Sequence, residues 1–270
     1  MSKVVVITGS TKGIGYGLAK EFLKRGCRVV VSGRKQEPLD KAVAALSTNH
    51  AGKVAGRLCD VTNLEDCENL FAFAAEKFGQ VDIWINNAGI AHPQRKLWEM
   101  PVEMVTQPVN ANIIGMIYGA QVAIRGMLKQ GHGWIYNTEG FGSNGRTRDG
   151  LSVYGSTKAA TTFLSKSLAS ELKDTPVKVG MLQPGMVITD MIVGQYDSPE
   201  DLEKVKPIFN IIANRVSDVA PWMAEKILAN QKNGAKLQYQ SRLQLMLRFI
   251  TAPFIKRDLF KKLSSKYYAF

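Results

Sequence analysis

Residues 4–15 read VVVITGSTKGIG and join a short β-branched run to a glycine-rich turn. The apolar run at 4–8 predicts a buried strand, and the helical pattern from Ile14 to Lys24 predicts a helix directly after the turn. Glycine in such a turn lets the backbone approach a pyrophosphate, whose charge the N-terminus of the helix favours. The spacing Gly-x-x-x-Gly-x-Gly differs from the commoner dinucleotide fingerprint, but its place after a first strand favours a nucleotide site over a purely structural turn.

Strands and helices alternate beyond this turn. Further strands are expected at 28–33, 54–60, 81–86, 133–137 and 177–185, and further helices at about 38–46, 64–78, 102–129 and 153–172. Pro108 should break or kink the long helix. Continuous apolar strands between amphipathic helices predict a parallel sheet covered on both faces. The fold class is therefore α/β, a single Rossmann-type doubly wound domain with a parallel central sheet and a basic helical C-terminal extension.

Composition narrows the class of protein. The chain has 270 residues, 45% of them hydrophobic, and no apolar run reaches the roughly 18 residues of a membrane-spanning helix. Strand-like residues from Lys3 onward leave no room for a signal or transit peptide before them. Cys27, Cys59 and Cys67 are spread without Cys-x-x-Cys spacing, which indicates reduced buried thiols in a cytosolic-type compartment. The histidines are scattered as well, so no metal site is expected.

The net charge of +12 is concentrated near the C-terminus. Residues 232–270 contain nine basic side chains and one acid, Asp258. The rest of the chain is only mildly basic. The charge therefore belongs to a tail, and we expect no nucleic-acid-binding domain.

The end of the second expected strand selects the dinucleotide. An acid there would hydrogen-bond the 2′-hydroxyl of the ribose, whereas an arginine accommodates a 2′-phosphate. This chain has Ser32, Arg34 and Lys35 at that point, Lys12 in the glycine turn, and no carboxylate before Glu37. Arg34 and Lys12 could also be solvated surface charges. Two cations without an acid nevertheless favour NADPH.

The segment YGSTK places Tyr154 and Lys158 four residues apart, on one face of the expected helix. A free phenol, with a pKa of about 10, is a poor acid–base catalyst near neutrality. A nearby ammonium group stabilises the phenolate and lowers that pKa. Taken alone, such a pair is more often a surface pair than a catalytic one.

Together with TGSTKGIG and NNAG (86–89), this segment resembles the short-chain dehydrogenase/reductases over residues 3 to about 191. The resemblance implies that Tyr154 is the general acid/base and that Lys158 holds the nicotinamide ribose and tunes the tyrosine. It implies that Asn112 holds a water of the proton relay, and that a hydride passes between nicotinamide and a carbonyl carbon. The cofactor-binding residues that it implies are Gly9, Ser10, Thr11, Lys12, Gly13, Ile14, Gly15, Ser32, Arg34, Asp60, Val61, Asn87, Ala88, Gly89, Tyr154, Lys158, Pro184, Gly185, Val187 and Thr189.

One position departs from the family pattern. The family usually has a serine thirteen residues before the tyrosine to bind the substrate oxygen, and here that position is Phe141. The segment NTEGFGSNG (137–145) has one extra residue relative to the common pattern. Ser143 is the nearest hydroxyl, and we assign it the missing role, with Thr138 as the reserve.

NTEGFGSNG followed by YGSTK resembles the chlorophyll(ide) b reductase branch of the family. Segments 209–228 and 248–254 resemble that branch more loosely. The resemblance implies NADPH-dependent reduction of the formyl group on ring B of a chlorin to a hydroxymethyl group. The chain also lacks the glycine-rich ending with which many members pack their tetramer, which favours this branch. A homo-oligomer is expected.

The sequence is compatible with two other functions. The apolar segment from Ile188 to Phe209 could wall a pocket for any bulky lipophilic aldehyde or ketone, such as a retinoid, a steroid or an acyl chain. For a chlorin, the expected wall is Met186, Val187, Ile188, Met191, Ile192, Val193, Ile208 and Phe209. The same segment could instead be a self-packed flap. The missing serine also gives some weight to a non-catalytic nucleotide-sensing or scaffold protein.

These patterns divide the chain into 1–231, the catalytic domain, and 232–270, a basic amphipathic tail. Within the domain, 190–231 is expected to form a substrate flap and a helix that begins after the N-cap Ser217 and runs to about Asn230. The tail carries apolar residues at helical spacing, flanked by cations: Leu243, Met246, Leu247, Ile250 and Phe254, with Arg242, Arg248, Lys256 and Arg257. Such a helix either lies on an anionic membrane surface or packs on the protein's own core. The expected location is cytoplasmic or stromal. If the helix lies on a membrane, the protein is also peripheral to that membrane.

Overall fold

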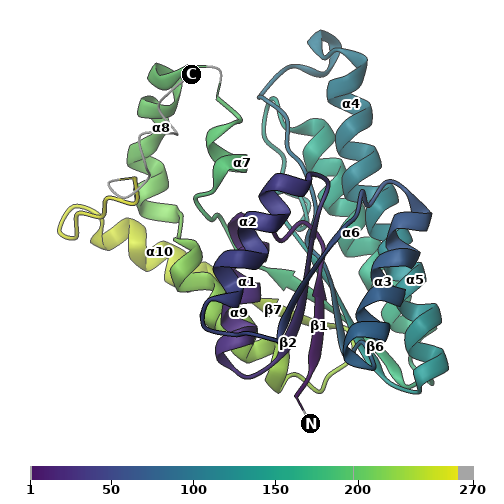
Figure 1. Cartoon of the computed structure of the whole chain (residues 1–270). Coiled ribbons are helices and arrows are strands. Elements are labelled where there is room, and N and C mark those ends of the chain that lie inside the picture. The colour runs from purple at the N-terminus through teal and green to yellow at the C-terminus, as the bar shows by residue number, and fades with distance from the viewer. Residues whose placement is uncertain (1, 197, 261–270) are drawn as a thin grey trace.

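The computed structural model describes residues 2–196 and 198–260, which fold around one parallel sheet (Figure 1). The strand order is β3-β2-β1-β4-β5-β6-β7, and every neighbouring pair is parallel. The strands are β1 (Val4–Ile7), β2 (Arg28–Gly33), β3 (Val54–Leu58), β4 (Ile83–Asn86), β5 (Gly133–Thr138), β6 (Val177–Gln183) and β7 (Ala235–Gln238). The order reverses between β1 and β4, where ligands bind in folds of this type.

Helices cover both faces of the sheet, as the sequence predicted. They are α1 (Gly13–Lys24), α2 (Gln36–Ser47), α3 (Leu64–Phe78), α4 (Val102–Val109), α5 (Gly115–Gln130), α6 (Ser152–Glu171), α7 (Asp190–Val193), α8 (Pro199–Ile212), α9 (Val216–Ala229) and α10 (Arg242–Thr251). Alternate residues of β1 enter two different apolar clusters. Val5 and Ile7 pack with α1 and α9, whereas Val4 and Val6 pack with α3 and α5. The doubly wound α/β fold is thus confirmed.

The long helix expected at 102–129 is interrupted just after Pro108. Helix α4 passes into a π-helical turn, Asn110–Ile114, before α5 begins. Proline lacks the N–H that would continue regular α-helical bonding. π-Turns of this kind are frequent at functional sites, and this one carries Asn112.

The sequence missed strand β7, which lies in the segment assigned to the tail. Ala235–Gln238 pairs with Gly180–Gln183 and forms the edge of the sheet. Its sequence, AKLQ, contains no continuous apolar run, because a short edge strand is exposed and often carries a charge. Residues 261–270 of the predicted tail lie outside the described residues.

Two further differences concern the C-terminal third. The N-cap prediction of Ser217 is wrong: α9 begins at Val216, and the carboxylate of Asp218 accepts a hydrogen bond from the backbone N–H of Arg215. The expected flap of short helices contains a 14-residue helix, α8, whose N-cap Ser198 accepts a hydrogen bond from the N–H of Asp201. Helices α7 and α8 enclose a small third apolar cluster with Leu259 and Phe260.

Other sequence expectations concern cysteines and membrane spans. Cys27, Cys59 and Cys67 are free and buried, as predicted. Among the described residues, none of the helices combines the length and the apolar character that crossing a bilayer requires.

Candidate active site

The glycine turn packs directly against the segment that follows β4. Gly9 and Gly13 have φ angles of +61°, which favour glycine. A Cβ on Gly15 would lie 2.5 Å from Nδ2 of Asn87. That same amide donates hydrogen bonds to the carbonyl oxygens of Thr8 and Gly9 at 2.9 and 3.0 Å. The turn is therefore held in the shape that leaves the N-terminus of α1 open to an anion.

A cavity of about 890 Å³ lies at the carboxyl edge of the sheet. It is lined by residues that end or follow all seven strands, namely Gly9, Gly33, Cys59, Asn87, Thr138, Gln183 and Gln238. Most of the residues that the sequence assigned to the cofactor line this cavity. Those that do are Gly9, Thr11, Lys12, Gly13, Ile14, Arg34, Asp60, Val61, Asn87, Ala88, Gly89, Tyr154, Lys158, Pro184, Gly185, Val187 and Thr189.

Three predicted cofactor residues support the turn from behind the cavity wall. Ser10 and Ser32 are fully buried, and the hydroxyl of Ser10 accepts a hydrogen bond from the N–H of Ser32 at 2.9 Å. Gly15 is buried against Asn87. None of the three is among the residues that line the cavity. They join β1, β2 and α1 and thereby fix the turn.

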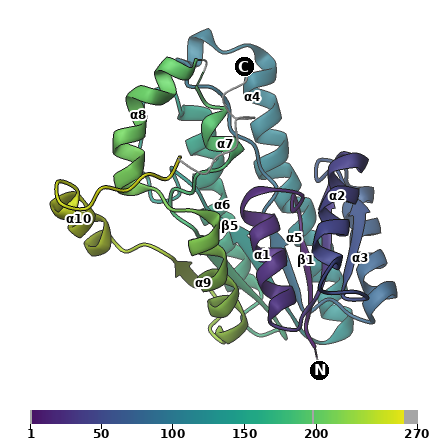
Figure 2. The same cartoon turned by 60° about the vertical axis from the view of Figure 1, so that its left-hand side comes forward.

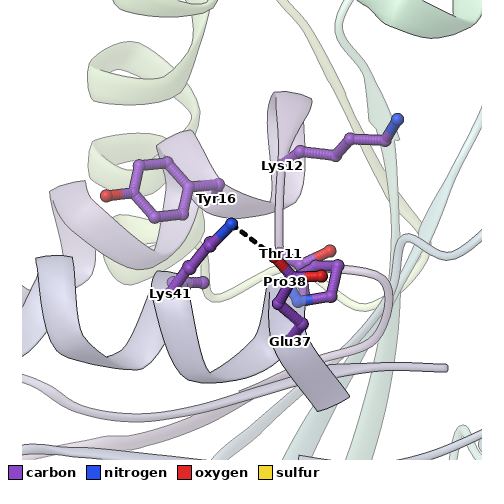
Figure 3. Close-up of a pocket in the computed structure, with 7 residues that line it drawn as sticks. Thr11, Lys12, Tyr16, Glu37, Pro38 and Lys41 are labelled. Atoms are coloured by element: carbon purple, nitrogen blue, oxygen red, sulfur yellow. Dashed lines mark hydrogen bonds and ion pairs between the residues drawn. The ribbon is translucent and has the colours of Figure 1, made fainter. Parts of the chain in front are cut away.

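At the end of the cavity where the sequence places the adenosine, Arg34 supplies a cation. Arg34 is exposed and lines the cavity. Glu37, the first carboxylate after β2, pairs with Lys41 on α2 at 2.5 Å, in a neighbouring hollow of about 440 Å³ between α1 and α2 (Figure 3). Figure 3 also shows Lys12 pointing away from that pair. The ammonium group of Lys12 instead pairs with the carboxylate of Asp190 at 2.7 Å, which links the glycine turn to the start of α7.

Tyr154 and Lys158 face the cavity from α6. The backbone N–H of Tyr154 donates to Nε2 of His92 at 3.3 Å, and Nζ of Lys158 donates to the carbonyl oxygen of Thr138 at 3.0 Å. Nζ of Lys158 lies 5.9 Å from the centroid of the Tyr154 ring. The backbone contacts at both residues fix the orientation of the pair.

The pKa values of this pair differ from the sequence-based expectation. Burial raises the pKa of Tyr154 to about 12, so the predicted lowering is wrong for this structure. Burial also lowers the pKa of Lys158 to about 8, while the carboxylate of Glu139 acts in the opposite direction. A buried charge loses hydration, which explains both shifts. Tyr154 is therefore a neutral phenol at neutral pH, the form that can donate a proton.

Asn112 is buried in the π-turn and all its side-chain contacts are internal. Its Oδ1 accepts from the N–H of Ile90 at 2.8 Å, and its Nδ2 donates to the carbonyl oxygen of Ile90 and the hydroxyl of Thr157 at 2.9 and 3.0 Å. Asn112 thus ties the irregular segment that follows Gly89 to α6. It does not line the cavity, and its role in a water relay stays a prediction.

The structure places Ser143 behind the cavity wall. The side chain is buried, its hydroxyl accepts a hydrogen bond from the N–H of Gly140 at 2.9 Å, and it does not line the cavity. Gly140 itself lies against the phenol, since a Cβ there would be 2.6 Å from the Tyr154 hydroxyl. Thr138 lines the cavity, and its buried hydroxyl has no hydrogen-bond partner among the described residues. Of these two residues only Thr138 lines the cavity, so we carry it forward as the candidate donor to a substrate oxygen.

Sequence reasoning missed Glu139 as a functional residue. Its fully buried carboxylate lies 2.7 Å from the ammonium group of Lys236 on β7, and it accepts a hydrogen bond from the hydroxyl of Thr162 at 2.7 Å. Both Glu139 and Lys236 line the cavity. The acid was visible only as part of NTEGFGSNG, and its partner lies in the strand that the sequence did not predict.

The substrate side of the cavity is mostly apolar. Met186, Val187, Met191, Ile192 and Phe209 line it, as expected for the predicted wall. Three other residues of that wall are placed elsewhere: Ile188 and Val193 are buried in the third apolar cluster, and Ile208 is exposed. Further lining residues come from α8, from β7 and from the start of α10, which sequence reasoning had not assigned to the site: Ile212, Gln238, Gln240, Ser241, Arg242 and Leu245.

Comparisons with known proteins agree with this geometry. A family model described as short chain dehydrogenase matches residues 3–199. The chain is 38% identical to the chloroplastic chlorophyll(ide) b reductase NOL of Arabidopsis thaliana over 236 residues, which cover 86% of this chain and 67% of that protein. It is also 38% identical to the rice protein of the same name (Oryza sativa subsp. japonica) over 253 residues, covering 92% and 71%.

Solved structures of similar shape contain nicotinamide dinucleotides. The 3-ketoacyl-(acyl-carrier-protein) reductase of Brucella melitensis complexed with NADH has a TM-score of 0.77 and 25% identity, covering 90% of this chain and 98% of that one. ElxO with NADP bound has a TM-score of 0.74 and 28% identity, covering 88% and 97%. The resemblance to the chlorophyll(ide) b reductases is confirmed by the plant relatives. The chain is an oxidoreductase that belongs to the short-chain dehydrogenase family.

Proposed function

We propose that this enzyme uses NADPH to reduce the formyl group of a chlorophyll b-type pigment to a hydroxymethyl group. The carrying observation is the cavity itself. One cavity is lined by the basic, glycine-rich turn, by apolar residues between 186 and 212, and by Tyr154. A chlorin is a large flat apolar ligand, which needs an apolar wall of this kind beside the nicotinamide. The similarity to the plant chlorophyll(ide) b reductases supports the same substrate class.

The preference for NADPH rests on the charges at the adenosine end. A 2′-phosphate would meet the guanidinium group of Arg34, and Lys12 lies in the adjoining turn. Arginine binds phosphate oxygens through directional, charge-assisted hydrogen bonds. Glu37, the acid closest in sequence, is engaged with Lys41. The similar solved structures hold either NADH or NADP, so the preference proposed here comes from this chain's own residues.

The residues of the site fit a reduction. NADPH, when bound, supplies the hydride that reaches the carbonyl carbon. Tyr154 donates its phenolic proton to the carbonyl oxygen, and its raised pKa keeps that proton in place at neutral pH. The ammonium group of Lys158 holds the ribose and stabilises the phenolate that remains. Thr138, which lines the cavity, is the candidate second donor to the same oxygen.

Three finer points complete the proposal. The enzyme works as a homo-oligomer. It acts on the cytoplasmic or stromal side of a membrane, since the plant relatives are named chloroplastic. Its C-terminal segment makes peripheral contact with that membrane.

The test is incubation of the enzyme with NADPH and chlorophyll b or chlorophyllide b, followed by chromatography of the pigment. The expected product is the hydroxymethyl pigment, and Tyr154→Phe is expected to form none while still binding NADPH. A parallel panel contains retinal, a steroid ketone and a long-chain acyl aldehyde. Rapid reduction of one of these without any pigment product would favour the second candidate, a carbonyl reductase for another bulky lipophilic substrate.

A further inference from the structure

Helix α10 exposes an apolar face. Leu243, Met246, Leu247 and Ile250 lie on one side of the helix at spacings of three and four residues. Leu243 and Ile250 are 61% and 60% exposed, and Phe254, just beyond the helix, is 86% exposed. Figures 1 and 2 show α10 at the periphery, beside α8 and away from the sheet. The apolar face of α10 therefore does not pack on the protein's own core, which was one of the two predictions for this helix.

The helix is held firmly although its face is exposed. The guanidinium group of Arg248 donates to the carbonyl oxygen of Ala213 and to Oδ1 of Asn214, at 3.3 and 2.8 Å. Arg257 donates to the carbonyl oxygens of Ile211 and Ala213, each at 3.0 Å. The chain then returns to α8, where the ring of Phe260 stacks on that of Phe209. Two of the four predicted flanking cations thus anchor the segment to the body.

The charges around this face are positive. No aspartate or glutamate occurs between Glu225 and Asp258. Arg242 and Lys256, at the two ends of the apolar face, are exposed. An exposed apolar stripe bordered by cations is complementary to an anionic bilayer surface, where the side chains enter the boundary between headgroups and acyl chains.

The same helix lies at the mouth of the active-site cavity. Arg242 and Leu245 line the cavity, while Leu243, Met246, Leu247 and Ile250 of the same helix are exposed to solvent. A bilayer that received the stripe would therefore adjoin the cavity mouth. We propose that α10 docks the enzyme on an anionic bilayer and that a lipophilic substrate enters the cavity directly from that membrane. The docking half specifies the peripheral membrane contact proposed above, and the substrate-entry half rests on the proposed pigment reduction.

Docking is tested by sedimentation of the full chain with vesicles of phosphatidylcholine alone or mixed with phosphatidylglycerol. The wild type is expected to bind the mixed vesicles more tightly and to lose binding as salt rises. Leu247→Glu and Ile250→Glu should each weaken binding at least tenfold, and Lys256→Gln about fivefold. Leu128→Glu, at an exposed leucine on α5, is the matched control and should bind like the wild type. Unfolding midpoints for all variants establish that the fold is intact.

Two results would overturn docking. One is the absence of wild-type binding to either vesicle. The other is a wild-type protein that does not bind vesicles but forms a dimer, with Leu247→Glu converting that dimer to a monomer. The apolar face of α10 would then be an interface between two copies of this chain.

Substrate transfer is tested separately with pigment in vesicles or dispersed in detergent. Leu247→Glu should lose turnover on vesicle pigment by the same factor as vesicle binding and keep turnover on dispersed pigment. Equal turnover by the variant and the wild type on vesicle pigment contradicts direct transfer. If neither pigment is reduced, the proposed function fails, while the sedimentation result still decides docking.

Discussion

Gly140 sets how closely the loop after β5 approaches the reacting phenol. A Cβ at this position would lie 2.6 Å from the Tyr154 hydroxyl and 3.1 Å from Cγ of Lys158. Ordinary van der Waals contact begins near 3.4 Å, so the hydroxyl has to move by about 0.8 Å. A misplacement of roughly 1 Å in a catalytic site costs about 10²-fold in rate. Gly140→Ala is therefore expected to lower kcat by roughly 10- to 100-fold.

The backbone itself can accept this substitution, because Gly140 is not among the glycines with positive φ. The assay is NADPH oxidation with a reducible aldehyde, alongside the dissociation constant for NADPH and the unfolding midpoint. Gly155→Ala, next to Tyr154 on α6, is the control, since its added Cβ would meet nothing closer than 4.0 Å. That variant should keep wild-type kcat. An unchanged kcat for Gly140→Ala would refute the placement of the phenol against this loop.

The other predictions concern charge and hydrogen bonding. Arg34→Asp should weaken NADPH binding by roughly ten- to a hundredfold, because it removes a charge-assisted hydrogen bond. NADH binding should be less affected. An unchanged ratio of the dissociation constants for NADPH and NADH contradicts the cofactor assignment. Because burial lowers the pKa of Lys158 to about 8, its ammonium is lost above that pH, so kcat/KM should fall as pH rises through about 8. A profile that stays flat through that range contradicts the need for the cation. Thr138→Val should lower kcat by the roughly 10²–10³-fold typical of one oxyanion-type donor, and Ser143→Ala by less. The reverse order would return that role to Ser143.

The fold could be predicted because its signals are local. Continuous apolar strands and the glycine turn at 9–15 result from burial on both faces and from backbone geometry, and both can be read from the residues. Strand β7 could not be predicted, because a short edge strand with a lysine shows no apolar run. The same gap concealed the pairing of Glu139 with Lys236.

The chemistry of the site depended on packing that the sequence does not contain. The spacing of Tyr154 and Lys158 places them on one helix face, but burial decides whether the pKa of the phenol rises or falls. Ser143 was chosen by its distance along the chain, whereas the turn places Gly140 against the phenol. For α10, the helical spacing was clear, and only the fold shows that its apolar face remains exposed.

The central claim is that Tyr154 completes an NADPH-dependent reduction of a pigment formyl group. The test uses NADPH in which both hydrogens on C4 of the nicotinamide are deuterium. The substrate is chlorophyllide b, and the product is analysed by mass spectrometry. We expect a hydroxymethyl pigment that carries deuterium on the new alcohol carbon, and no such product from Tyr154→Phe, although that variant binds NADPH. A product without deuterium, or equal product from Tyr154→Phe, would contradict it.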